Sequence, residues 1–151
     1  MPGLEFALRI TADLEPPIEH GTWDGQRRRI VPINGGTVEG PHFKGRIIPG
    51  GADWQTLAEA DGLSRLDARY TLQHEDGTIV GVVNQGVRRG PPGVMARLAA
   101  GEEVHPSAYY FRACPVFEAP PGPHRWLTES TFVCVGSRWP DRVELEIWRV
   151  L

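Results

Sequence analysis

The stretch EGPHFKGRIIPGGADW, residues 39–54, decides how this chain folds. Its centre, Phe43–Ile48, contains the aromatic and β-branched residues that favour an extended strand. Proline and glycine mark turns, so we expect Pro49–Gly51 to stop that strand. The stretch therefore predicts a strand, a tight turn, and a defined place for Asp53 and Trp54 directly after the turn.

Strand signals continue on both sides of this stretch. Glu5–Asp13 alternates between apolar and polar residues, and Arg142–Leu151 does the same at the other end of the chain. Ser64–Gln73 and Thr78–Asn84 look like the two arms of a hairpin, because an Asp-Gly pair lies between them. Alternation of this kind places one apolar face on a core, and the pattern is typical of an all-β protein.

Two segments depart from the strand pattern. Asp53–Asp61 is short and could be helical. Gly86–Pro106 is expected to be a long loop in which Val94–Ala100 forms about two turns of helix, with Gly101 as its C-cap. Loops of this length often serve as functional lids or interface elements. The alternative is that this loop is a plug that closes one end of the barrel. Its apolar residues also make a homo-oligomer plausible.

The whole chain, residues 1–151, reads as one domain. The predicted fold is all-β: a single antiparallel closed β-barrel of about eight to ten strands, with one long loop that carries a short helix. The two terminal strands are expected to pair, which would remove exposed sheet edges. The 18 glycines and 14 prolines fit the many turns of such a fold.

Composition also excludes several classes of protein. The net charge of −3 argues against a nucleic-acid binder, and no apolar run is long enough to span a membrane. Because no signal peptide is visible at the N-terminus, we expect a cytoplasmic protein. Cys114 and Cys134 lie in apolar runs without metal-ligand spacing, and we expect buried free thiols. The five histidines lie far apart in the sequence, so we expect no metal site and no cofactor.

Four strings, taken together and in this order, resemble a known family: GGTVEGPHFKGRIIPGGADW, DARYTLQHEDGTIVGVVNQG, YYFRACPVFEA and WLTESTFVCVG. The family is the uncharacterised DUF3237 family, also called the UPF0311 proteins, and the resemblance covers nearly the whole chain. It implies a closed barrel similar in shape to allene oxide cyclases and other calycin-like barrels. Ala119 and Thr128 depart from the threonine and asparagine usual in the family, which would alter the ligand if these positions line a pocket.

Three residues are candidate catalytic groups. Asp53 precedes Trp54, and a carboxyl beside a large apolar ring can have a raised pKa that suits a general acid or base; alternatively Asp53 caps the following turn. Tyr70 lies on an apolar face, where its hydroxyl is either a proton donor to a ligand or a satisfied core group. Arg112 lies within an apolar strand, where it either pairs with Asp53 or Glu39 or clamps an anionic substrate.

The candidate substrate-binding residues are weaker signals, and each has an ordinary structural explanation. Asn84 could bind a ligand carbonyl or form a turn, and Trp54 and Trp126 could be ligand walls or core residues. Glu39 is a further candidate base or a solvated turn residue, and Thr128 is included because it departs from the family.

These residues lead to two expectations for function. The first is a cofactor-independent isomerase, cyclase or lyase, acting by general acid–base chemistry on a small aromatic or conjugated molecule in the barrel mouth. The second is a non-catalytic barrel that binds a small molecule or serves a partner protein.

Overall fold

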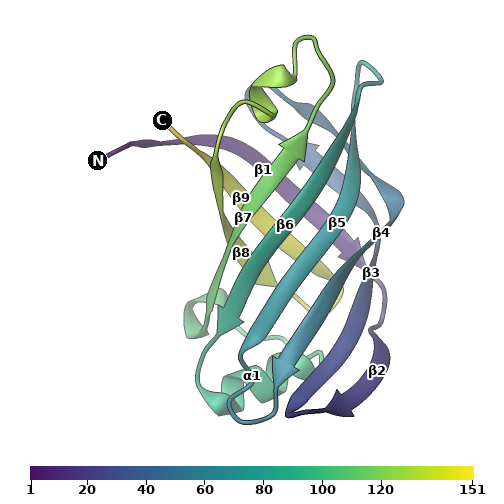
Figure 1. Cartoon of the computed structure of the whole chain (residues 1–151), viewed down its shortest axis with the longest axis vertical. Coiled ribbons are helices and arrows are strands. Elements are labelled where there is room, and N and C mark those ends of the chain that lie inside the picture. Colours follow the sequence, from purple (N-terminus) through teal and green to yellow (C-terminus); the bar gives the residue numbers. More distant parts are fainter.

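The computed structural model describes all 151 residues, with nine β-strands, one α-helix and two short 3-10 helices (Figure 1). The strands are β1 (Leu4–Leu14), β2 (Ile18–Trp23), β3 (Gln26–Glu39), β4 (Lys44–Ala58), β5 (Ser64–His74), β6 (Ile79–Arg89), β7 (Tyr110–Glu118), β8 (Phe132–Arg138) and β9 (Arg142–Val150). The helices are α1 (Pro92–Ala99), η1 (Pro106–Ala108) and η2 (Arg125–Leu127).

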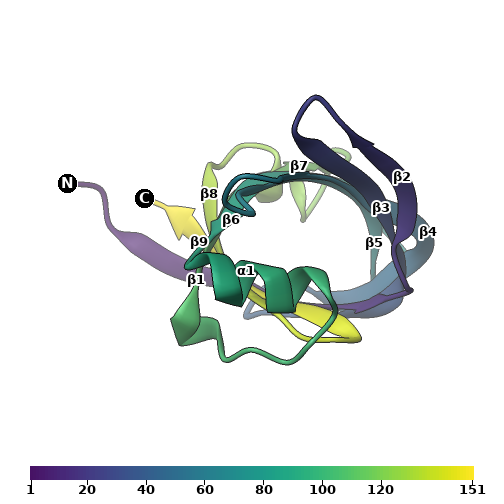
Figure 2. The same cartoon turned by 90° about the horizontal axis from the view of Figure 1, so that it is seen from below.

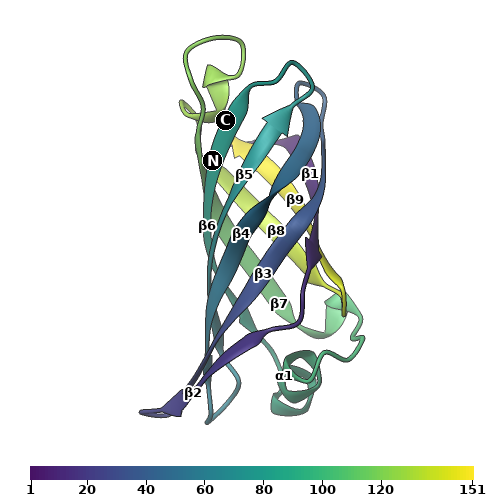
Figure 3. The same ribbon diagram turned by 90° about the vertical axis from the view of Figure 1, so that its right-hand side faces the viewer.

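The strands close into an antiparallel barrel, so the predicted fold class is confirmed. The strand order is β1-β9-β8-β7-β6-β5-β4-β3-β2, and β1 also pairs with β3. Eight strands therefore form the closed wall, and β2 extends from β3 as an outer arm near one end (Figure 3). The two terminal strands pair as predicted, from Leu4 opposite Val150 to Asp13 opposite Arg142.

Strand β4 corrects two predictions from the deciding stretch. Its residues pair with β3 and β5 as far as Ala58, so the region predicted to be helical after Asp53 is a strand. Between the pairs Ile48–Thr71 and Ala52–Arg69, β4 advances four residues while β5 advances two. Pro49–Gly51 is thus a bulge within one long strand and does not end it.

Glycine makes the approach of the two strands at this bulge possible. A Cβ atom on Gly51 would lie 2.6 Å from both the Arg69 carbonyl oxygen and the Tyr70 Cβ. Gly50 adopts a φ of 120°, a conformation that other residues rarely take. The prolines and glycines therefore bend the strand without interrupting its pairing.

Helix α1 lies across one end of the barrel, as the view from that end shows (Figure 2). It overlaps the helix predicted over Val94–Ala100, and it buries Met95 and Leu98. Gly62 packs directly against it, since a Cβ there would lie 2.6 Å from the Met95 Cβ. This position fits the expectation of a plug at one barrel end.

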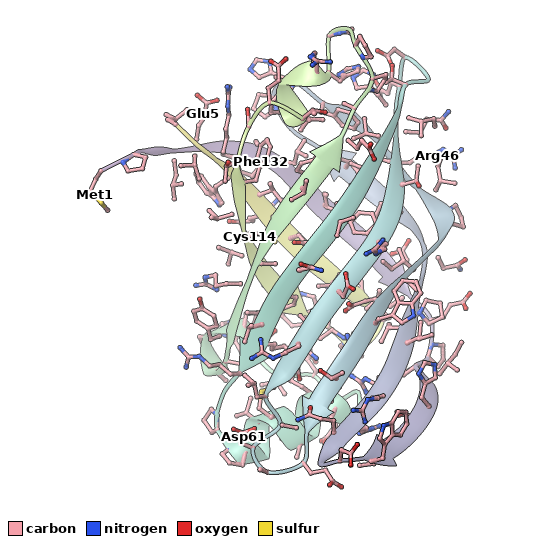
Figure 4. The ribbon with its side chains drawn as sticks, viewed as in Figure 1. Met1, Glu5, Arg46, Asp61, Cys114 and Phe132 are labelled. Carbon is pink, nitrogen blue, oxygen red and sulfur yellow. The ribbon has the colours of Figure 1, made fainter.

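The opposite half of the barrel interior is filled by apolar side chains. Phe132 and Phe117 pack edge to face with ring centroids 5.0 Å apart, and Phe43 is buried close to that end. Figure 4 shows Phe132 near this end and Asp61 near the α1 end. Each such fully buried side chain contributes about 1.5–3 kcal/mol to stability through the hydrophobic effect.

None of the helices is long and apolar enough to cross a membrane.

Candidate functional site

The barrel interior is hollow at the end that α1 covers. A narrow cavity of about 40 Å³ lies between the inward faces of the strands. Eleven of its sixteen lining residues are hydrophobic, a group that includes Tyr70; the five others are Asp53, Gln55, Asn84, Arg88 and Arg138. A mostly apolar lining with a few convergent polar groups is typical of a site for one small organic molecule, but this cavity is narrower than most ligand pockets.

Small residues keep this part of the barrel open. Asp53 of β4 pairs with Ala68 of β5, which pairs with Asn84 of β6, so these three inward positions form one row across neighbouring strands. On β8, a Cβ atom at Gly136 would lie 2.7 Å from three atoms of the Phe111 ring. The absence of a side chain at Gly136 therefore lets that ring lie back against the wall.

Asp53 lies inside the barrel wall with both carboxylate oxygens engaged. Its Oδ1 accepts the backbone N–H of Asp67 at 2.9 Å, and its Oδ2 accepts Gln55 Nε2 at 2.7 Å. Burial raises the pKa of Asp53 above its ordinary value, against the opposing effects of the Gln55 hydrogen bond, the Arg88 charge and the Asp67 N–H. A carboxyl group whose pKa is raised by burial in an apolar cavity is suited to accept and release a proton.

Gln55 connects Asp53 to the helix that covers the cavity. Its Oε1 accepts Arg29 Nε at 2.8 Å, and Arg29 Nη1 donates to the Ala99 carbonyl of α1 at 3.1 Å. The Arg29 side chain is fully buried, and this burial lowers its pKa to about 10. A continuous set of hydrogen bonds therefore joins the end of α1 to Asp53 through two buried side chains.

Two arginines of the cavity were missed by the sequence analysis. Arg88 of β6 is 1% exposed and Arg138 of β8 is 6% exposed. Burial, together with the nearby charge of Arg138, lowers the pKa of Arg88 to about 10. The alternation of side chains along β6 could have identified Arg88. Val82 and Asn84 point inward, and Arg88 follows them at an even spacing, so its side chain points to the same face.

Tyr70 and Asn84 present polar atoms that the protein leaves unpartnered. The Tyr70 hydroxyl and the Asn84 Oδ1 are both buried, and neither forms a hydrogen bond within the chain. Burial raises the pKa of Tyr70, so its hydroxyl stays protonated and available as a donor. The structure thus brings Asp53, Tyr70 and Asn84 to one cavity.

Arg112 and Trp54 lie outside this cavity, on the outer surface of the barrel. Arg112 is exposed and pairs with neither Asp53 nor Glu39, because the inward positions of β7 are Phe111 and Ala113 on either side of it. Its guanidinium donates to the Phe111 carbonyl at 2.9 Å and lies 5.1 Å from the Tyr110 ring centroid. Trp54 is 45% exposed, since it follows the inward Asp53 in the same strand.

The other predicted binding residues lie at the end of the barrel remote from α1. Glu39 is exposed at the end of β3, and Trp126 packs against Phe132 with ring centroids 6.1 Å apart. Thr128 Oγ1 accepts the Ala119 N–H at 2.8 Å and donates to the Ala119 carbonyl at 3.3 Å. The two departures from the family pattern therefore contact each other and do not line the cavity.

A second polar cluster forms at that same end. His74 and His124, far apart in sequence, stack with ring centroids 4.2 Å apart, and the Asp76 carboxylate lies 2.7 Å from His124 Nε2. The hydrogen bond from His124 holds the pKa of Asp76 well below its usual range. Their ligand atoms lie within 4.8 Å of one another, so these residues could hold a metal ion such as zinc.

The cysteines are free: Cys134 is buried and Cys114, contrary to expectation, is exposed.

Comparison with known proteins places this barrel among similar ones. The family model described as "Protein of unknown function (DUF3237)" matches residues 2–150. A UPF0311 protein of Clostridium acetobutylicum is 37% identical over 147 residues, which cover 97% of this chain and 92% of that protein. The crystal structure of a conserved protein of unknown function from Rhodopseudomonas palustris superposes with a TM-score of 0.93 at 35% identity, covering 100% of this chain and 98% of that one.

A more distant similarity extends to a fungus. A hydroalkoxylation enzyme of Penicillium herquei is 34% identical over 76 residues, half of each protein. The crystal structure of an enzyme from the same fungus superposes with a TM-score of 0.74 at 22% identity, covering 99% of this chain and 95% of that one, which shows a shared fold.

Proposed function

Since the chain belongs to the DUF3237 family, whose description names no activity, we propose its function from the cavity itself. The protein catalyses proton transfer on a small aromatic or conjugated organic molecule bound inside the barrel, at the end covered by α1. The reaction is an isomerisation, a cyclisation or an elimination, for which side chains alone can move the protons.

One observation carries this proposal: Asp53, with a raised pKa, shares a largely apolar cavity with two unpartnered polar groups. Ionisable residues with shifted pKa values in a cavity are more frequent at functional sites than elsewhere in proteins. The Tyr70 hydroxyl can donate to a ligand oxygen, and the Asn84 Oδ1 can accept from a ligand hydroxyl. The three groups thus provide a proton carrier, a donor and an acceptor around one molecule.

The proposed step is the addition of a substrate hydroxyl to a conjugated carbonyl system. Ionised Asp53 accepts the hydroxyl proton while the oxygen forms a bond to the far carbon of the C=C. The electron pair of that double bond moves to the carbonyl oxygen, and Tyr70 stabilises the resulting enolate by donating a hydrogen bond. The proton on Asp53 then passes to the α-carbon, which restores the carbonyl and leaves a cyclic isomer. The reverse sequence is a ring-opening elimination.

The Penicillium herquei relative supports this class of reaction. Hydroalkoxylation is the addition of an O–H group across a carbon–carbon double bond, which is the step described above. The similarity covers half of this chain, so it supports the type of chemistry and leaves the substrate to experiment.

A non-catalytic carrier is the alternative, and one observation favours it. Both oxygens of Asp53 already accept hydrogen bonds, from Gln55 and from the Asp67 backbone, so this carboxylate has a structural role as well. A carrier would bind a conjugated molecule in the same cavity and release it unchanged.

A cyclisation assay separates the two functions. The probe is 2′-hydroxychalcone, whose conversion to the cyclic flavanone is followed by loss of its long-wavelength absorbance. We expect acceleration above the buffer rate, and Asp53→Asn should lower that acceleration at least about 100-fold, as for a lost general base. The matched control is Asp13→Asn, an exposed carboxylate on β1 at the same barrel end. Equal rates for Asp53→Asn and Asp13→Asn would contradict the catalytic role, and binding without conversion would favour the carrier.

A further inference from the structure

Two buried guanidinium groups in the cavity lack an acidic partner. Arg88 forms no side-chain hydrogen bond or ion pair with the protein, although it is 1% exposed. Arg138 makes a single long contact, from Nη1 to the Arg142 carbonyl at 3.5 Å, and its Nε is unpartnered. Every ion pair of the chain involves other cations, which lie on the surface or at the His74–Asp76 turn.

An arginine cannot lose its charge to relieve this situation. Guanidinium groups stay protonated in proteins, and a buried charge without a partner is strongly unfavourable. Both side chains line the cavity, and the Nε of each forms no hydrogen bond within the protein. The resting protein therefore presents positive charge and hydrogen-bond donors without acceptors.

No carboxylate forms a hydrogen bond or ion pair with either guanidinium, although the charge of Asp53 acts on both arginines and that of Asp141 on Arg138. Asp53 is the only carboxylate that lines the cavity, and its oxygens are engaged by Gln55 and the Asp67 backbone. The Tyr109 hydroxyl accepts the backbone N–H of Arg138 at 2.8 Å and contacts neither guanidinium as a hydrogen-bond acceptor. The Phe111 ring, 5.5 Å from the Arg88 guanidinium carbon, gives only a cation–π contact.

We propose that the cavity binds a small conjugated organic oxyanion, with its negatively charged oxygen against the guanidinium groups of Arg88 and Arg138. A carboxylate, a phenolate or an enolate has this chemistry, and a planar apolar body fits the hydrophobic lining. This inference rests on the proposed function only in placing the ligand in the cavity. It names the substrate class, and it assigns to Arg88 and Arg138 the anion-binding role predicted for Arg112.

The charge count favours a single negative charge on the ligand. The cavity lining holds two cations, Arg88 and Arg138, and one carboxyl, Asp53. With Asp53 ionised, the lining has a net charge of +1, which one ligand anion neutralises. Arg29, just behind Gln55, adds further positive charge next to the cavity and favours an anion over a neutral molecule.

The test compares an anion with its neutral isostere. Cinnamate is a planar conjugated carboxylate, and cinnamamide has the same shape without the charge. We expect cinnamate to raise the melting temperature of the full-length protein with increasing concentration, and cinnamamide to leave it unchanged. Acetate supplies the charge without the conjugated body and should stabilise far less than cinnamate. Equal stabilisation by cinnamate and cinnamamide, or by cinnamate and acetate, would overturn the inference.

Variants then locate the binding site. Arg88→Met and Arg138→Met remove one charge each from the cavity, and each should weaken cinnamate binding at least about tenfold. Arg112→Met is the matched control, because it removes the same charge from the outer face of the neighbouring strand. If either cavity variant binds cinnamate as tightly as Arg112→Met does, the assigned site is wrong. Having two cavity variants keeps the test decisive if one of them fails to fold.

Asp53→Asn separates this inference from the proposed function. The variant should keep cinnamate binding, because the contacts to Arg88 and Arg138 remain, while losing turnover of 2′-hydroxychalcone. A protein that binds cinnamate through these arginines but converts nothing would contradict the catalytic proposal alone. A protein that converts neutral substrates through Asp53 without preferring anions would contradict the anion inference alone.

Discussion

Replacing Gln55 with methionine tests how strongly the buried hydrogen bonds hold the site together. Methionine has a similar length and volume, so it removes the polar contacts without opening a large void. Gln55 is 5% exposed, donates to Asp53 at 2.7 Å and accepts from Arg29 at 2.8 Å. A hydrogen bond to a charged group contributes about 1.5–3 kcal/mol. Because each partner keeps one other bond, to the Asp67 N–H or the Ala99 carbonyl, we expect a net loss of about 2–4 kcal/mol.

Urea unfolding followed by tryptophan fluorescence measures this loss. The matched control is Gln73→Met, which removes an exposed bond from Arg46 to Gln73 Oε1 at 3.0 Å and should change stability by no more than about 0.5 kcal/mol. A loss below about 1 kcal/mol for Gln55→Met, or one equal to that of Gln73→Met, would refute the reasoning. The Gln55 bond also lowers the pKa of Asp53, so the variant should shift any Asp53-dependent activity toward higher pH.

Three other substitutions probe packing and ionisation, each measured by urea unfolding. Gly136→Ala should cost about 1–3 kcal/mol, because the new Cβ would lie 2.7 Å from the Phe111 ring and force it toward the cavity. Folding raises the pKa of Asp53 above its ordinary value of 3.8, so the protonated carboxyl stabilises the folded protein fully below pH 3.8. This stabilisation is lost as pH rises through the raised pKa. Asp53→Asn should therefore remove that pH-dependent fall in the free energy of unfolding. The hydrogen bond from His124 lowers the pKa of Asp76 in the folded protein, so ionised Asp76 stabilises the fold above pH 3.8. This stabilisation is lost as pH falls through the lowered pKa. Asp76→Asn should therefore reduce the fall in the free energy of unfolding at acid pH.

Each of these variants has a control in the same chain. Gly93→Ala adds a methyl group where no atom lies within 4 Å, so it should leave stability nearly unchanged. Asp13→Asn changes an exposed carboxylate and should leave both pH-dependent declines as they are in the parent protein. A Gly136→Ala protein as stable as Gly93→Ala, or an Asp76→Asn protein with the acid decline intact, would contradict the contacts on which these expectations rest.

The alternation of apolar and polar residues was enough to predict the fold class. Glu5–Asp13 and Arg142–Leu151 are strands that pair with each other, and the short helix lies close to where its composition placed it. Three of the candidate residues, Asp53, Tyr70 and Asn84, line one cavity, and their roles there stay predictions. These conclusions depend on local periodicity, which the sequence displays directly.

Parity within a strand explains the errors. Arg112 and Arg88 both lie in apolar strands, but successive side chains point to opposite faces, so a shift of one position moves an arginine from the cavity to the surface. Trp54 is exposed for the same reason, one residue after the inward Asp53. Apolar neighbours alone do not show which residues of a strand face inward when the outer surface also carries Val116 and Tyr110.

The deciding stretch shows the division between sequence and tertiary structure most clearly. Its residues determined a strand at Phe43–Ile48 and a distortion at Pro49–Gly51, since proline and glycine act locally on the backbone. Only the pairing of β4 with β3 and β5 decided that the distortion is a bulge, because neighbouring strands supply hydrogen bonds on both sides of it. In the same way, only closure of the barrel brought Arg88 and Arg138 from separate strands to the cavity of Asp53, since those contacts join positions far apart along the chain.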